Sequence, residues 1–121
     1  MKKILIVEDQ APMAKILADI FKKENYDVIT ANNGQIGIDK AKEIKPDLII
    51  TDIMMPVKTG LDLLKELRDL PEFAATPIFV ITAKGGTTDS KTAADAGASS
   101  FITKPFSPGQ IVLEIKKFLG D

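Results

Sequence analysis

Five residues that can do chemistry stand at the ends of short apolar runs in the sequence. They are three carboxylates, one hydroxyl and one ammonium: Glu8, Asp9, Asp52, Thr82 and Lys104. If the carboxylates gather at one place they repel one another, by on the order of 4 kcal/mol per pair at about 4 Å and an effective dielectric of about 20. One lysine cannot balance three such charges, so we expect the three carboxylates to bind a divalent cation.

An all-oxygen ligand set favours Mg²⁺ or Mn²⁺ over Zn²⁺. Mg²⁺ keeps several waters and accepts phosphate oxygens from a partner, and the Thr82 hydroxyl and Lys104 ammonium suit the remaining phosphoryl oxygens. A carboxylate can itself accept a phosphoryl group. Asp52 is the expected nucleophile because it stands alone after its run, and Glu8 and Asp9 are expected to hold the metal beside it. Singly, each residue also has an ordinary explanation as a helix cap, a strand residue or a surface charge.

The elements that must position these residues follow from hydrophobic periodicity. Five apolar runs begin 20 to 30 residues apart, which is enough for a strand, a crossover helix and two loops. Three of them are continuous rather than alternating, as expected for parallel strands covered on both faces. The predicted strands are Ile4–Val7, Val28–Thr30, Leu48–Thr51, Ile78–Ile81 and Phe101–Thr103.

Between these runs the apolar residues change to a helical period. A short fourth helix is expected over Lys91–Ala96, capped by Thr87 or Thr88 and closed by Gly97. The other four predicted helices carry the stripes Met13, Leu17, Ile20 and Phe21; Ile38, Ala41 and Ile44; Leu61, Leu64 and Leu67; and Ile111, Ile115, Phe118 and Leu119.

The alternation predicts an α/β fold: a doubly wound, flavodoxin-like (βα)5 domain with a parallel sheet of order 2-1-3-4-5. Ligands of such sheets bind outside the carboxyl ends of the strands, where the order reverses between strands 1 and 3. That topology would bring the three carboxylates, Thr82, Ala83 and Lys104 into one crevice.

Amino-acid composition excludes several classes of function. The 121 residues, with 16 Lys+Arg against 17 Asp+Glu, predict one domain over residues 1–121 and give no reason to expect direct nucleic-acid binding. Without cysteine or histidine there is no disulfide, zinc–thiolate site, histidine base or Ser-His triad. The longest charge-free stretches, Val28–Ile38 and Phe73–Ala83, are too short to span a bilayer, so we expect no membrane insertion and a cytoplasmic location.

Four motifs occur in order along the chain: Glu8-Asp9; Asp52 followed by Met54-Met55-Pro56 and Gly60; Thr82-Ala83; and Lys104-Pro105-Phe106. Together they resemble the receiver domain of bacterial response regulators, over essentially the whole chain. The resemblance implies a phosphorylation-controlled switch rather than an enzyme, with slow autodephosphorylation. Its phosphoryl donor would be a histidine kinase or a histidine phosphotransfer protein.

The resemblance also implies a role for each matching position. Asp52 would be the phosphoryl acceptor; Asp9, Asp52 and the Met54 backbone carbonyl would ligate Mg²⁺, with Glu8 acting through metal-bound water. Thr82, Ala83 and Lys104 would contact the phosphoryl group. Thr82 and Phe101 would form the switch, changing a surface made by the helix at 91–96, the strand at 101–103 and the last helix, to bind a protein target or a second copy. Met54 and Lys84 would tune the phosphoryl lifetime.

Three details accompany the resemblance. The Lys104–Pro105 bond is expected to be cis. Thr59 stands where the family more often has Asp, and Phe101 lacks the hydroxyl of the tyrosine found in some members.

Two other classes of protein remain as alternatives. A phosphatase of the haloacid-dehalogenase type also uses Asp, Thr, Lys and Mg²⁺, but its nucleophile follows the first strand in a D-x-D pattern, where this chain has Glu8-Asp9-Gln10. An interaction module that never meets phosphate would not require all five residues. Incubation with Mg²⁺ and acetyl phosphate separates the three classes.

Overall fold

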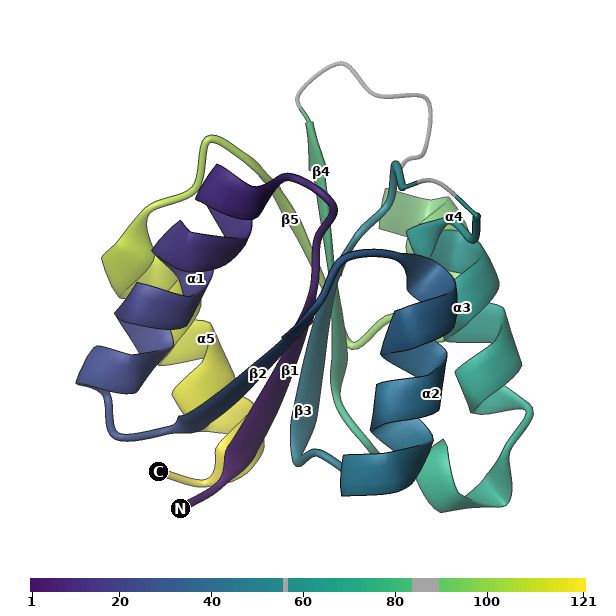
Figure 1. Cartoon of the computed structure of the whole chain (residues 1–121), viewed down its shortest axis with the longest axis horizontal. Helices are drawn as coiled ribbons and strands as arrows, with labels where there is room; N and C mark the ends of the chain where they lie inside the picture. Colours follow the sequence, from purple (N-terminus) through teal and green to yellow (C-terminus); the bar gives the residue numbers. More distant parts are fainter. Residues whose placement is uncertain (56, 84–89) are drawn as a thin grey trace.

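The computed structural model describes residues 1–55, 57–83 and 90–121 and contains one five-stranded sheet (Figure 1). All strand pairings are parallel, in the order β2-β1-β3-β4-β5. The strands are β1 (Lys3–Val7), β2 (Asp27–Ala31), β3 (Leu48–Asp52), β4 (Ile78–Ala83) and β5 (Ser100–Lys104). The predicted fold class and strand order are therefore confirmed.

Helices cover both faces of the sheet: α1 and α5 lie on one face, and α2, α3 and α4 on the other (Figure 1). They are α1 (Ala11–Lys23), α2 (Gly34–Ile44), α3 (Gly60–Arg68), α4 (Ser90–Asp95) and α5 (Pro108–Leu119), and the 3-10 turn η1 (Pro71–Phe73) follows α3. This double cover is why the central strands read as unbroken apolar runs.

Alternate residues of each central strand feed two separate cores. Along β1, Leu5 and Val7 join the cluster beneath α2 and α3, whereas Ile4 and Ile6 join the cluster beneath α1 and α5. All four side chains are fully buried. Burial of this kind contributes about 1.5–3 kcal/mol per aliphatic side chain, so it fixes the strand register and with it whatever follows each strand.

The helical predictions hold in outline and differ in detail. The fourth helix runs one residue earlier than expected, and Gly97 ends it with a φ of 107°. Its expected caps, Thr87 and Thr88, lie outside the described residues. Phe118, part of the apolar stripe predicted for the last helix, is 41% exposed, and its ring packs in a T-shaped arrangement with Phe79 at 5.1 Å between ring centroids. The buried residues of α5 follow an i, i+4, i+8 spacing that bypasses position 118.

The first and last residues of the chain lie side by side at the amino edge of the sheet, where the strands begin (Figure 1). Lys2 Nζ lies 3.6 Å from Asp121 Oδ1. Within the described residues, none of the helices has the length and apolar character needed to cross a membrane.

Candidate functional site

The expected residues meet at the carboxyl edge of the sheet, where the strands end. Asp52 and Lys104 are the last residues of β3 and β5, and Thr82 is the penultimate residue of β4. Glu8 follows β1 directly, and its N–H donates to the Ala31 carbonyl at 2.9 Å, which extends the ladder between β1 and β2 by one step. The backbone of the sheet thus sets the position of each group.

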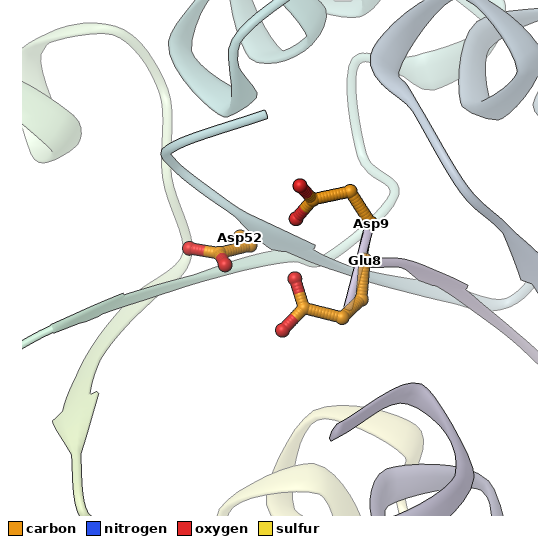
Figure 2. A group of neighbouring side chains, drawn as sticks. All are labelled: Glu8, Asp9 and Asp52. Atoms are coloured by element: carbon orange, nitrogen blue, oxygen red, sulfur yellow. The ribbon is translucent and has the colours of Figure 1, made fainter. Parts of the chain in front are cut away.

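The three carboxylates point into the same space, Glu8 and Asp9 from the end of β1 and Asp52 from β3 (Figure 2). One oxygen of each lies within 4.8 Å of the others. Glu8 and Asp52 are 3% and 9% exposed, whereas Asp9 is exposed to solvent. Glu8 and Asp9 also line a hollow of about 590 Å³ between α1 and the start of α2. The cluster is therefore buried on one side and open on the other.

Lys104 is shared between two of the acids. Its Nζ donates to Glu8 Oε1 and to Asp52 Oδ2, each at 3.2 Å. Burial alone would lower the pKa of Lys104, but the charges of Asp52 and Glu8 outweigh it and raise that pKa above its ordinary value. Lys104 therefore stays a cation, yet one ammonium cannot neutralise three carboxylates.

Glu8 carries the clearest sign that the cluster is built for a cation. Its Oε2 is buried and finds no hydrogen-bond partner in the described part of the chain. Burial, followed by the neighbouring Asp52 carboxylate, raises the pKa of Glu8 to about 7, and Lys104 opposes the rise. An unpaired buried carboxylate oxygen is costly unless a charge or a donor meets it. With only oxygen ligands on offer, these residues fit Mg²⁺ or Mn²⁺.

The loop after β3 explains two positions of the Asp52 motif. A Cβ added at Gly60 would lie 2.2 Å from the Asp52 carbonyl oxygen, so only glycine lets α3 begin so close to the end of β3. Thr59, the departure from the family pattern, is the N-cap of α3 and forms a reciprocal capping box with Asp62. Thr59 therefore has a structural reason of its own, which sequence analysis did not foresee.

The remaining predicted residues lie on β4 and β5 and in the loops that follow β3 and β5. Thr82 is buried and lies opposite Thr103 in the ladder, while Phe101 is half-buried against the core beneath α2 and α3. Met54 is 70% exposed, at the start of the loop after β3. The Lys104–Pro105 bond is cis, as predicted.

Ala83 ends β4, in register with Lys104. Pro56 and Lys84 lie outside the described residues. Sequence analysis missed Arg68, which stands among other charged residues at the end of α3 and carries no motif that would single it out.

Comparison with known proteins shows the family to which the chain belongs. Residues 4–116 match the family model described as the response regulator receiver domain. The chain therefore belongs to the response regulator receiver domain family, whose members are phosphorylation-controlled signalling switches rather than classical enzymes and bind Mg²⁺ at an acidic pocket.

Among curated proteins, the chain is 39% identical over 117 residues to the transcriptional regulatory protein ResD of Bacillus subtilis, covering 97% of this chain and 48% of that protein. The chain thus spans about half the length of the curated relatives it matches. Among solved structures, a putative response regulator of Chloroflexus aurantiacus aligns with a TM-score of 0.93 at 29% identity, covering 99% and 98% of the two chains. The chemotaxis response regulator CheY4 of Vibrio cholerae aligns with a TM-score of 0.90 at 28% identity, covering 98% of each.

Proposed function

We propose that this chain is a signalling switch that accepts a phosphoryl group on Asp52. The observation that carries the proposal is the meeting of three carboxylates with the shared Lys104 ammonium at the ends of separate strands. The sequence contains no histidine, so a phosphohistidine donor must lie outside these 121 residues. A histidine kinase or a histidine phosphotransfer protein is the donor we propose.

The transfer is a displacement at phosphorus. A carboxylate oxygen of Asp52 attacks the phosphorus as the bond to the donor nitrogen breaks, and the electron pair of that bond remains on the imidazole. Lys104, already 3.2 Å from Asp52 Oδ2, neutralises charge on the transferring group. Mg²⁺ held by Glu8, Asp9, Asp52 and the Met54 carbonyl, with Glu8 acting through a bound water, would supply further charge neutralisation.

The phosphoryl group then acts as the switch signal. It adds nearly two negative charges, for which the Thr82 hydroxyl and the Ala83 backbone N–H are the proposed donors beside Lys104. Phe101 and Thr82 lie on adjacent strands, with Phe101 opposite Val80 in the ladder. We propose that movement of Thr82 toward the phosphoryl oxygens lets the Phe101 ring turn inward. That change alters the surface formed by α4, β5 and α5.

The partner of that surface is a protein rather than a nucleic acid or a membrane in our proposal. A net charge of -1 gives the chain no electrostatic attraction for phosphate backbones. Residues 1–121 would form one receiver domain, with either a downstream protein or a second copy as the occupant of the surface.

Incubation with Mg²⁺ and acetyl phosphate tests the proposal. Intact-mass measurement is expected to find one added phosphoryl group that hydroxylamine removes, as an acyl phosphate requires. Asp52→Asn should take up none, because an amide cannot act as the nucleophile, whereas Asp69→Asn, an exposed acid at the end of α3, should behave as the native chain does. Continuous hydrolysis of a small phosphomonoester would favour a phosphatase, and absence of any reaction would favour an interaction module.

A further inference from the structure

Arg68, the last residue of α3, is a half-buried cation that joins separate segments of the chain. Its Nε donates to the Gly97 carbonyl at 2.9 Å, Nη1 to the carbonyls of Thr76 at 2.7 Å and Phe73 at 2.5 Å, and Nη2 to Ser99 Oγ at 3.3 Å. No ion pair to Arg68 is present among the described residues. The guanidinium therefore donates only to neutral acceptors among the described residues. These hydrogen bonds hold the segments in place relative to one another and do not neutralise a charge.

One of these acceptors, the Gly97 carbonyl, belongs to the turn that closes α4. The Gly97 N–H donates to the Ala94 carbonyl and the Ala98 N–H to the Ala93 carbonyl, both at 3.0 Å, with Gly97 in the left-handed region. This is the Schellman arrangement that closes a helix. Arg68 binds the carbonyl of Gly97 itself, the residue that closes the turn.

Side-chain burial contributes little to the position of α4. The helix has six residues, and of its side chains that the structure describes only Ala93 is buried. Alanine offers the smallest apolar area to bury. Beyond α4, Ala96 and Ala98 are part-buried against the core beneath α2 and α3, and they too offer only methyl groups. The closing turn and the contact with Arg68 therefore add polar restraints to small apolar contacts at the carboxyl end of α4.

Arg68 and Gly97 also fit each other closely. A Cβ at residue 97 would lie 2.8 Å from Arg68 Cγ, so any other residue would displace the arginine stem. The Ser99 hydroxyl accepts from the Ile78 N–H at 3.1 Å, and the Ser99 N–H donates to the Ile78 carbonyl at 2.8 Å. The Arg68 contacts thus continue directly into the ladder between β4 and β5.

Residues that follow Gly97 line a hollow together with Phe101. The hollow has a volume of about 350 Å³ and is lined by Lys91, Ala94, Ala98, Ser99, Ser100 and Phe101. Two of those residues directly follow Gly97. By binding the Gly97 carbonyl, Arg68 therefore holds the segment whose next two residues form part of the wall of this hollow.

We propose that Arg68 is a positioning residue of the switch: it fixes the carboxyl end of α4 on α3, so that Phe101 moves against a stationary wall when Asp52 is phosphorylated. The inference rests on the proposed function of Asp52. Without the guanidinium, the end of α4 is free to shift in both states, and the two states become alike at this surface.

Hydrogen exchange followed by mass spectrometry tests the first half of this proposal on the unmodified protein. Arg68→Met keeps an unbranched stem beside Gly97 and removes all the donors, and Lys65→Met, exposed on the same helix, is the matched control. We expect the amides of residues 96–98 to exchange roughly tenfold faster in Arg68→Met than in the native chain, beyond any change in β1 and β3. Unchanged exchange at 96–98, or equal acceleration throughout the chain, would overturn the proposal.

The second half is tested after treatment with acetyl phosphate and Mg²⁺. Intact mass should show equal phosphorylation of the native chain, Arg68→Met and Lys65→Met. The exchange difference between phosphorylated and unmodified forms over residues 90–101 should persist in Lys65→Met and largely vanish in Arg68→Met. A full response in Arg68→Met would refute the positioning role.

A conservative variant keeps the test decisive if Arg68→Met does not fold. Arg68→Lys retains the cation with fewer, differently directed donors and should give an intermediate result in both halves; native behaviour would contradict the proposal. A native chain that accepts no phosphoryl group would remove the proposed function and the switch role with it. The exchange at 96–98 in unmodified protein would still report separately whether Arg68 fixes α4.

Discussion

The two edges of the sheet hold polar side chains in opposite ways. At the amino edge, Asp47 Oδ2 accepts from the Lys3 N–H at 2.7 Å, and the Tyr26 hydroxyl donates to Asp121 Oδ2 at 2.6 Å. At the carboxyl edge, a buried oxygen of Glu8 has no partner within the described chain, and one ammonium serves two acids. The amino edge satisfies its polar groups; the carboxyl edge leaves charge uncompensated.

The amino edge contributes to the stability of the fold, whereas the carboxyl edge gives up stability to form a site. A hydrogen bond of the kind found at the amino edge contributes about 0.5–1.5 kcal/mol, whereas a buried acceptor left unsatisfied costs about 1–3 kcal/mol. The carboxyl edge therefore lowers the stability of the metal-free protein, and a bound cation can recover what is lost. Sites that act on ligands are where such local conflicts are expected.

The largest expected effect is stabilisation by Mg²⁺, because the ion binds the folded cluster and not the unfolded chain. At 100 times the dissociation constant the free energy of unfolding should rise by about 2.7 kcal/mol. Urea titration at fixed ionic strength measures it. Glu8→Gln should reduce the effect, and Asp47→Asn, an acid at the other edge, should leave it intact; no response in the native chain would remove the metal site.

The second expected effect is a pH dependence without Mg²⁺. Folded Glu8 holds its proton up to about pH 7, whereas its ordinary pKa is 4.5, so between these values the folded state binds more protons than the unfolded state. The free energy of unfolding should therefore fall as pH rises through this window, by at most about 1.4 kcal/mol per unit. Urea titrations in a metal chelator, comparing the native chain with Glu8→Gln, isolate the slope. Equal slopes in the two proteins would show that Glu8 does not titrate in this way.

The other edge should respond to pH in the opposite sense. The hydrogen bond from Tyr26 lowers the pKa of Asp121 below its ordinary value of 3.8. Its contribution to stability is present above that ordinary value and is lost as pH falls through the folded pKa. Asp121→Asn should thus weaken the decline in stability at acid pH while leaving the slope near neutrality unchanged.

The fourth prediction compares the loss of one carboxylate at each edge. In the absence of metal, Asp52→Asn should raise the free energy of unfolding by about 1 kcal/mol, since it removes like-charge repulsion while Lys104 keeps Glu8 as a partner. Asp47→Ala should lower it by about 1 kcal/mol through loss of its hydrogen bond. Parallel urea titrations compare them. The same sign for both would mean that the edges do not differ as described.

The smallest effect concerns the phosphoryl lifetime. Hydrolysis needs a water in line with phosphorus, and the exposed Met54 side chain offers little to hold one. Met54→Asn combined with Lys84→Glu should shorten the lifetime by roughly two- to tenfold, followed by intact mass at constant Mg²⁺ and pH. Val57→Asn, on the same loop and 77% exposed, is the matched control and should have no effect. Equal or slower loss in the double variant would rule out the tuning role.

Sequence alone predicted the sheet and the meeting of the site residues, because parallel strands end at one edge and five apolar runs mark those strands. It did not distinguish buried Glu8 from exposed Asp9, since adjacent residues beyond a strand carry no periodicity. Arg68 could not be foreseen either. Its acceptors are three backbone carbonyls and a hydroxyl up to 31 positions away, and backbone groups leave no trace in the residue pattern.

The ends of the chain meet at the edge opposite Asp52, the proposed phosphoryl acceptor (Figure 1). The strand that ends in Asp52 has five residues, so at about 3.3 Å per residue the acceptor lies roughly 15 Å from the edge where both ends emerge. A polypeptide attached at either end therefore begins out of contact with a phosphoryl group on Asp52. A signal could pass to such a segment only through the body of the domain or by its folding back over a helical face.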